Sequence, residues 1–207
     1  LLDRQGRRKW VESEAYKRLA GQRRYLCAKL ARTRRCEHQA MANRMLGYGD
    51  RFFVETMSFK GLAKKAKRQE PKPGEREKRR KRYGKSVGNK APALFLNILE
   101  KKVQDKGGQF HRIDTWSAKA SQYDHTDMSC KKKDIGERWA LLSDGHRIQR
   151  DLYSAYLLKC TNDTLDGFIQ RQLEDGFEQF LQHHAQEIER LSHMQTPCST
   201  GVRCQAA

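Results

Sequence analysis

The sequence lacks paired cysteines of the C-x-x-C kind and long apolar runs, and it contains few acidic residues. Its six cysteines are scattered over 207 residues, at Cys27, Cys36, Cys130, Cys160, Cys198 and Cys204. In a chain of this length, scattered cysteines predict reduced thiols in a cytoplasmic compartment and argue against a disulfide framework. The absence of a long apolar run and of a signal peptide argues against a membrane partner.

The scarcity of acidic residues is uneven along the chain. There are 43 Lys and Arg against 25 Asp and Glu, a formal charge of +18. Residues 161–207 contain seven acidic and three basic side chains, a local charge of −4, so the first 160 residues carry +22 (18 plus 4). Nucleic acid is the simplest partner for a segment of this charge.

Apolar residues make up 37% of the chain, and about 44% once the 15 glycines are added, slightly below the usual share for a compact domain. The chain opens without a methionine and enters Arg-rich sequence at once. We therefore expect residues 1–9 to be the tail of an upstream segment, in a longer protein that supplies part of the core.

The first half of the chain predicts a helix, a strand and a second helix. Apolar periodicity predicts one long helix, or two stacked helices, over residues 10–47, with Leu19, Leu26, Leu30, Met41 and Met45 near one face. The charged face is either simply solvated or tracks phosphates through Arg23, Arg24, Arg32, Arg34 and Arg35. A strand over 51–57 follows, with Glu55 near its end, and Ser58 is a plausible N-cap for a helix over 59–67.

Residues 68–90 combine ten Lys and Arg with two prolines and three glycines. Such a segment cannot bury a core, so it predicts a flexible basic loop that contacts nucleic-acid backbone. A solvated spacer is the alternative. Tyr83, the only aromatic residue in the segment, could stack on a base.

The remaining pattern completes an α/β order of elements. It predicts a helix over 91–106, a strand over 110–116, polar irregular sequence over 117–136, a helix over 149–159 with Asp151 in its first turn, an acidic helix over 165–194, and a disordered tail over 196–207. This order favours an α/β nuclease core with inserts over an all-helical DNA-binding module.

Two isolated carboxylates stand out in this basic chain. Glu55 ends an apolar strand and Asp151 begins a helix, and such positions can bring both side chains to one edge of a sheet. Carboxylates bind Mg²⁺, and the basic surface would bind a polyanion. The alternative is that Glu55 is an exposed strand residue and Asp151 only balances a helix dipole.

Four stretches together resemble the C-terminal half of TnpB, the OrfB-like family of transposon-encoded, RNA-guided DNA endonucleases related to type V CRISPR effectors. They are FVETMSFKGLAKKAK (53–67), KRYGKSVGNKAPALFLNILEKKVQDKG (81–107), Ser121-Gln122 and QRDLYSAYLL (149–158), within a similarity over roughly residues 10–190. The resemblance implies a RuvC-like, RNase H-type fold, Mg²⁺ or Mn²⁺ as cofactor, guide RNA and target DNA as partners, and a bacterial, nucleoid-associated location.

The resemblance also assigns residues and domains. Glu55 matches the second catalytic carboxylate and Asp151 the third, whereas no residue matches the first aspartate; Asp3 has no strand before it. The expected fold is a partial RNase H-like core with a long helical insert and a basic loop. Its expected layout is a core over 10–160 lacking its first strands, a degenerate zinc-ribbon-like insert over 117–148, an acidic helix over 161–195 and the tail over 196–207.

Zinc is not expected in the insert. The family commonly carries four cysteines there, but this chain offers only Cys130, with His125 and His146 nearby. We therefore expect His125 to be an ordinary surface histidine. The insert would be ordered by packing, for example of Trp139, Leu141 and Leu142.

Ten basic residues are predicted to contact nucleic acid: Lys64, Lys65, Lys67, Lys78, Arg79, Arg80, Lys81, Arg82, Lys85 and Arg150. The leading function is the C-terminal part of a transposon-associated, RNA-guided, Mg²⁺-dependent DNA endonuclease. The alternative is a truncated or nuclease-inactive relative that only binds guide RNA and DNA. A basic ribosome-associated protein would explain the charge but not the two carboxylates.

Overall fold

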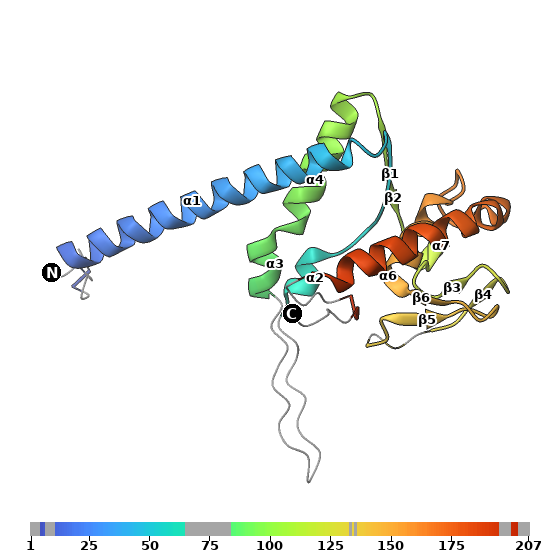
Figure 1. Ribbon diagram of the computed structural model, residues 1–207. Helices are drawn as coiled ribbons and strands as arrows, with labels where there is room; N and C mark the ends of the chain where they lie inside the picture. Colours follow the sequence, from blue (N-terminus) through green and yellow to red (C-terminus); the bar gives the residue numbers. More distant parts are fainter. Residues whose placement is uncertain are drawn as a thin grey trace, which may run out of the picture. The chain divides into compact units, whose positions relative to one another are not determined.

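The computed structural model describes residues 5–6, 11–64, 84–132, 134, 136–194 and 200–202 (Figure 1). The protein is a mixed α/β structure, as the sequence predicted at the level of class, and it divides into two compact units. The first unit takes the described residues within 1–50 and 58–108, and the second those within 51–57 and 109–207. The core predicted over 10–160 therefore spans parts of both units.

The first unit is helical. It contains α1 (Glu14–Met45), α2 (Phe59–Ala63), α3 (Gly84–Lys90) and α4 (Pro92–Asp105). α1 begins at Ser13, whose hydroxyl accepts a hydrogen bond from the backbone N–H of Tyr16 at 3.2 Å. α4 begins with proline at its first position, where the missing N–H costs nothing.

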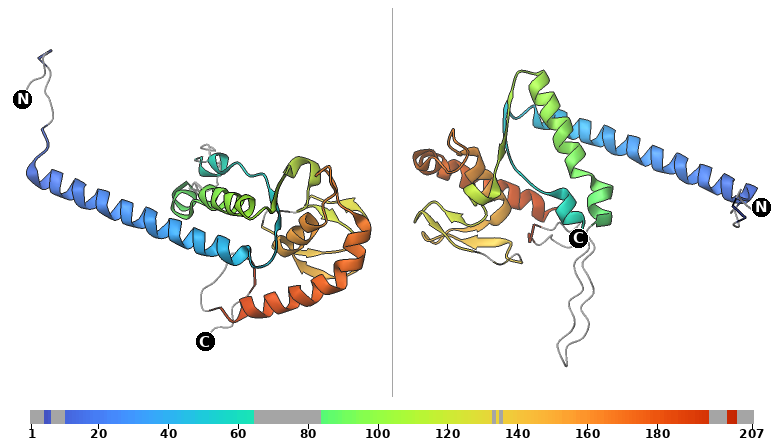
Figure 2. Two further views of the ribbon diagram at one scale, coloured as in Figure 1. Left: turned by 90° about the horizontal axis from the view of Figure 1, so that it is seen from above. Right: turned by 180° about the vertical axis from the view of Figure 1, so that it is seen from behind.

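α1 and α4 pack against each other near the C-terminal end of α1. Ala42, Leu99 and Val103 are fully buried there, and the ring of His38 meets the ring of Phe95 edge-on at 5.6 Å. The N-terminal part of α1 extends beyond α4 in both views of Figure 2. Its predicted apolar face, which includes Leu19, Leu26 and Leu30, is therefore exposed among the described residues.

The second unit combines three two-stranded sheets with three helices. Its elements are β1 (Arg51–Glu55), β2 (Gln109–Ile113), α5 (Thr115–Ala118), β3 (Tyr123–Asp124), β4 (Ser129–Cys130), β5 (Trp139–Leu141), β6 (Arg147–Gln149), α6 (Arg150–Lys159) and α7 (Gln170–Ser192). β1 and β2 run parallel with Arg51 opposite Gln109 and Glu55 opposite Ile113, whereas β3–β4 and β5–β6 are antiparallel hairpins. α6 packs against β1 and against α7.

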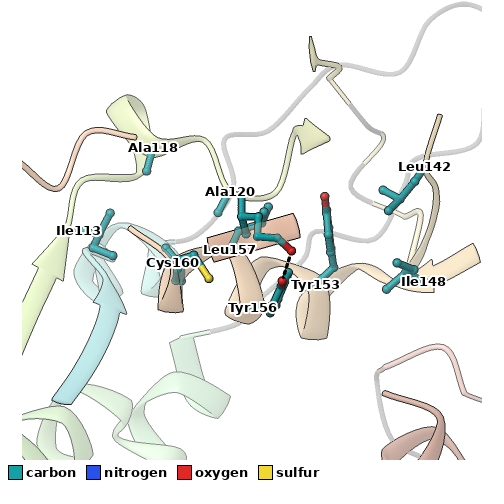
Figure 3. Close-up of a cluster of buried hydrophobic side chains, with 11 residues drawn as sticks. Ile113, Ala118, Ala120, Leu142, Ile148, Tyr153, Tyr156, Leu157 and Cys160 are labelled. Atoms are coloured by element: carbon teal, nitrogen blue, oxygen red, sulfur yellow. Dashed lines mark hydrogen bonds between the residues drawn. The ribbon is translucent and has the colours of Figure 1, made fainter. Parts of the chain in front are cut away.

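One apolar cluster holds the second unit together (Figure 3). Ile113 from β2, Ile148 from β6, and Tyr153 and Leu157 from α6 are all but inaccessible to solvent. Phe180 and other apolar residues of α7 pack onto this cluster. The hydroxyl of Tyr156 donates a hydrogen bond to the carbonyl of Leu173, which ties α6 to α7.

Several element boundaries differ from the prediction. β1 ends at Glu55 and β2 at Ile113, where Asp114 caps the short helix α5 through the N–H of Trp116. Residues 84–90, predicted as part of the basic loop, form α3, which packs on α2. Gly84 allows this packing, because a Cβ there would lie 2.6 Å from the Ala63 carbonyl oxygen. The rest of the predicted loop, residues 68–83, lies outside the described residues.

The insert and the C-terminal region also differ. Within 117–136, predicted to be irregular, residues 117–118 are the end of α5 and residues 123–130 form the β3–β4 hairpin. The acidic helix α7 begins at Gln170, because residues 162–167 form a loop organised by the Asn162 side chain. Of the predicted disordered tail, residues 200–202 are described: Val202 is buried, and the Thr200 carbonyl accepts a hydrogen bond from Gln149.

Candidate functional site

Glu55 lies at the C-terminal edge of the parallel β1–β2 pair. It is the last residue of β1, it pairs in register with Ile113, and it is partly buried. Burial raises the pKa of the Glu55 carboxyl, and the negative charge of Asp151 raises it further. α6, which carries Asp151 in its first turn, packs against β1, which ends at Glu55, so the two carboxylates that the sequence singled out lie on adjacent elements.

Asp151 is held at the start of α6 by polar neighbours. Gln149 caps the helix by accepting a hydrogen bond from the N–H of Leu152 at 2.8 Å, and its side-chain N–H₂ group also approaches Asp151 at 3.4 Å. The guanidinium groups of Arg138 and Arg150 each lie 3.7 Å from an Asp151 oxygen. These groups fix the carboxylate and balance part of its charge, while half of its surface remains open to solvent.

This pair supplies oxygen ligands of the kind that Mg²⁺ prefers. Mg²⁺ is commonly held by one or two carboxylates, with water and substrate phosphates completing its shell, so Glu55 and Asp151 fit a partial site. Within the ranges that the structure describes, no group of three or more His, Cys, Asp or Glu side chains is placed to hold a metal ion. In the described part of the chain, Glu55 and Asp151 alone therefore do not form a complete set of metal ligands.

The predicted nucleic-acid contacts divide into three groups. Lys64, which follows α2, and Lys85, in α3, are exposed in the first unit. Arg150 is different: its side chain is only 14% exposed, and it donates a hydrogen bond to the Asp134 carbonyl at 3.1 Å. The Arg150 side chain therefore contacts two other parts of the protein, the Asp134 carbonyl and the Asp151 carboxylate. Outside the described residues lie Lys65, Lys67, Lys78, Arg79, Arg80, Lys81 and Arg82.

The insert is ordered chiefly by a polar network around Asp124. This buried carboxylate accepts hydrogen bonds from the N–H and hydroxyl of Thr126 and from the N–H and hydroxyl of Ser143. Ser143 follows β5, so the network joins the two hairpins. Burial alone would raise the pKa of Asp124, but these hydrogen bonds outweigh it, and the pKa is lowered.

Two sequence predictions about the insert were wrong. His125 is not a surface histidine: it is 3% exposed, its Nδ1 lies 2.7 Å from the Tyr153 hydroxyl, and its ring meets that of Phe177. Residues of α6 and α7 bury His125, and the polar sequence around it gives no sign of these distant contacts. Of the three residues expected to pack, Leu142 is buried, but Leu141 is 71% exposed and Trp139 only partly buried.

Sequence reasoning missed Arg138 and Gln149. Arg138 lies in the polar stretch before β5, and no periodicity marks it as a partner of Asp151. Gln149 carries no local signal either, because the residues that usually cap a helix start are Ser, Thr, Asp, Asn and Gly, and glutamine is not one of them. Both residues come to the site only once the β5–β6 hairpin is formed.

Comparisons with known proteins give no assignment. No model of a protein family matches the sequence, and no curated protein matches it significantly. In the described part of the chain, no helix combines the length and apolar character needed to cross a bilayer. A function must therefore be argued from the residues and their geometry.

Proposed function

We propose that this chain is the C-terminal, catalytic part of a metal-dependent DNA endonuclease of the RNA-guided TnpB type, with a RuvC-like core. One observation supports the proposal: α6, which begins with Asp151 in its first turn, packs against β1, whose last residue, Glu55, lies at the C-terminal edge of a parallel strand pair. Such an edge is where ligands bind in α/β folds. The charge of +18 and the four TnpB-like stretches support a nucleic-acid substrate.

Glu55 and Asp151 would hold Mg²⁺ or Mn²⁺. A bound ion would neutralise charge on a phosphodiester and favour ionisation of a water molecule. The raised pKa of Glu55 fits this role, because a carboxylate repelled by a second carboxylate gains from a neighbouring cation.

The protein's own groups would position the substrate. Gln149 fixes the direction of the Asp151 carboxylate, and Arg138 keeps a positive charge beside it. In this proposal a guide RNA selects the target DNA by base pairing, and the basic chain contacts the backbone without reading sequence. Lys64 and Lys85 are the described, exposed lysines assigned to such contacts.

A second candidate is a relative that binds guide RNA and DNA without cutting. The observation in its favour is that Arg138 and Arg150 both lie 3.7 Å from Asp151 and already balance its charge without a metal ion. The sequence also offers no match for the first catalytic aspartate. These points favour binding without cleavage for the 207-residue chain, whatever a longer protein does.

Metal binding by the pair tests the proposal. Binding of Mn²⁺ is measured by electron paramagnetic resonance, and the midpoint of thermal unfolding is followed with and without Mg²⁺. Wild type should bind Mn²⁺ and be stabilised by Mg²⁺, by about 2.7 kcal/mol when the free ion is at 100 times its Kd. Glu55→Gln and Asp151→Asn should lose both effects, and the exposed control Asp163→Asn should keep them.

Two other outcomes separate the candidates. Equal metal binding by wild type and both site variants would refute a site at Glu55 and Asp151. If wild type binds no metal but binds nucleic acid tightly at low salt, the binding-only candidate holds instead.

A further inference from the structure

Trp116 exposes its indole ring at the edge of the sheet that carries Glu55. Its side chain is 83% exposed, although its backbone N–H is fixed by Asp114 and the next residue, Ser117, donates a hydrogen bond to the same carboxylate at 3.0 Å. Single exposed apolar side chains are common on protein surfaces. The location of Trp116, rather than its exposure alone, therefore carries the inference.

The location follows from the strand register. Glu55 pairs with Ile113, and the N–H of Thr56 donates to the Ile113 carbonyl at 2.8 Å, so β1 and β2 end at the same edge. Trp116 is the third residue after Ile113, and Met57, 49% exposed, is the second residue after Glu55. Two exposed apolar side chains, Trp116 and Met57, thus follow shortly after the paired strand ends, in the same unit as Glu55 and Asp151.

The charges nearby indicate which partner suits this surface. Lys119, exposed, ends α5 one turn after Trp116, and Arg138 lies beside Asp151. An exposed aromatic ring in a basic chain suits an unpaired nucleobase, whose face would stack on the ring while its phosphates meet positive charges such as that of Lys119. In a duplex the base faces are already stacked on each other, so such a ring selects unpaired nucleotides.

We propose that Trp116 stacks on an unpaired nucleobase and thereby positions a single strand beside Glu55 and Asp151. The inference rests on the proposed function for its substrate class, and it adds the residue that selects single-stranded over paired nucleic acid at the site. Because the ring would contact the base and not the phosphodiester, Trp116 would act as a positioning residue.

The test uses tryptophan emission in the full chain. Trp10→Phe with Trp139→Phe leaves Trp116 as the only tryptophan, and the protein is titrated with single-stranded oligo-dT and with a duplex of the same length. Single strands should quench the emission in step with the anisotropy of a labelled strand, and the duplex should bind with little quenching. If the double variant folds poorly, wild type and Trp116→Ala are titrated instead. Quenching that is present in wild type and absent in Trp116→Ala then comes from Trp116.

Affinity supplies the second measurement. Loss of one stacked base is worth about 1–3 kcal/mol, so Trp116→Ala should weaken single-strand binding by about 5- to 150-fold, with less change for the duplex. Trp116→Phe should recover part of the loss, because phenylalanine keeps a stacking face. Leu141→Ala is the matched control, an equally exposed apolar side chain on β5 whose loss should leave both affinities unchanged.

The outcomes distinguish the two proposals. Single strands that bind without quenching Trp116, or bind Trp116→Ala unchanged, would overturn the stacking and leave the nuclease proposal standing. A blue shift of Trp116 emission that grows with protein concentration, without any nucleic acid, would instead assign the surface to a protein contact. If no oligonucleotide binds even at low salt, the proposed function itself fails, and the stacking fails with it.

Discussion

At the scale of single residues, the pKa of Glu55 is shifted for reasons that the structure explains. Burial, then the charge of Asp151, raises its pKa, so the folded state binds a proton more tightly than the unfolded chain does. Between the ordinary pKa of 4.5 and the raised value, the free energy of unfolding falls as pH rises, and the loss persists at neutral pH.

We therefore expect Glu55→Gln to be slightly more stable than wild type at pH 7.5 and no more stable at pH 4. The substitution removes the buried charge and its repulsion by Asp151 while keeping the size of the side chain. Thermal unfolding followed by circular dichroism at both pH values checks this, with the exposed Glu178→Gln as control. A lower unfolding midpoint for Glu55→Gln at pH 7.5 would show that the carboxylate is held by stabilising bonds instead.

Asp124 gives a second residue-scale prediction. Its four accepted hydrogen bonds join the two hairpins of the insert, and its removal would leave the Ser143 N–H without that partner. Asp124→Ala should lower the free energy of unfolding by about 2–4 kcal/mol, as measured by urea denaturation. Because hydrogen bonds provide this connection, EDTA should leave the unfolding midpoint unchanged in Asp151→Asn, which lacks the proposed Mg²⁺ site. A large destabilisation by EDTA would mean that a metal ion orders the insert.

His125 predicts a pH dependence on the acidic side of neutrality. Burial lowers its pKa, although the charges of Asp124, Asp144 and Glu174 partly oppose the effect. The unfolded chain then takes up a proton near pH 6.5 that the folded state does not. Stability should be fully present above pH 6.5 and fall below it, by no more than about 1.4 kcal/mol per pH unit for this one group.

The substitution His125→Asn tests the assignment, because its side-chain amide can act as donor or acceptor and so keep a hydrogen bond with the Tyr153 hydroxyl. The variant should lose less stability than wild type between pH 7.5 and 5.5. Some slope will remain, since burial also lowers the pKa of His184. Identical slopes for the two proteins would assign the pH dependence to other groups.

At the scale of elements, the turn that follows α4 depends on a glycine with no room for a side chain. A Cβ on Gly108 would lie 2.4 Å from the Asp50 carbonyl oxygen and 3.0 Å from a methyl group of Val103. Gly108→Ala should therefore destabilise the first unit by about 1–3 kcal/mol, the usual cost of overpacking. Gly21, inside α1, meets nothing within 4 Å, so Gly21→Ala should stabilise the protein by about 0.5–1 kcal/mol.

Differential scanning calorimetry of Gly108→Ala and Gly21→Ala measures whether each substitution lowers or raises the unfolding temperature. Opposite shifts of the unfolding temperature are expected from the same chemical change. Equal shifts would mean that the close approach of Gly108 to Asp50 does not exist in solution.

The elements that sequence predicted well are those with strong local signals. α1, α4 and α6 have apolar periodicity and clear starts, and the Ser58 hydroxyl caps α2 by accepting a hydrogen bond from Gly61 as expected. The hairpins β3–β4 and β5–β6 have two or three residues per strand, too few for any alternation to be visible. Their order comes from distant partners such as Asp124 with Ser143, which no local pattern encodes.

The candidate site, too, could be predicted from the sequence only in part. Glu55 and Asp151 could be named from sequence because a strand end and a helix start are local features, and both are found there. Their interaction, the approach of Arg138 and the location of Trp116 depend on how β1, β2 and β6 are arranged. That arrangement is set by the apolar cluster around Tyr153, whose contacts span more than 20 residues of sequence.

At the scale of the whole molecule, charge is divided along the chain. The first 160 residues carry +22, and residues 161–207 carry −4, mostly on the acidic helix α7. Side-chain packing explains the apolar face of α7, which covers the core of the second unit, but not the surplus of Lys and Arg elsewhere. A surplus of this size stabilises no fold, since like charges repel, and it indicates a polyanionic partner.

We therefore expect the 207-residue chain to bind nucleic acid and not to cleave it. Binding follows from the charge, and the lack of cleavage follows from the missing first aspartate. Affinity measured by fluorescence anisotropy should fall steeply as salt rises, because each phosphate contact releases counterions. Affinity that does not change with salt would contradict the electrostatic basis. Mg²⁺-dependent cleavage by wild type that disappears in Asp151→Asn would contradict the second half.

The basic segment over 68–90 should supply part of this affinity without base specificity. Replacing Lys78, Arg79, Arg80, Lys81 and Arg82 by Gln should weaken binding to all sequences alike and flatten the salt dependence, by roughly one unit of slope for each lost phosphate contact. Replacing Glu70, Glu75 and Glu77 by Gln is the matched control of opposite sign, because it removes negative charge from the same segment and should strengthen binding. If the five-residue variant binds as tightly as wild type with the same slope, the segment is a solvated spacer, and the phosphate contacts must come from other basic residues, such as those of α1.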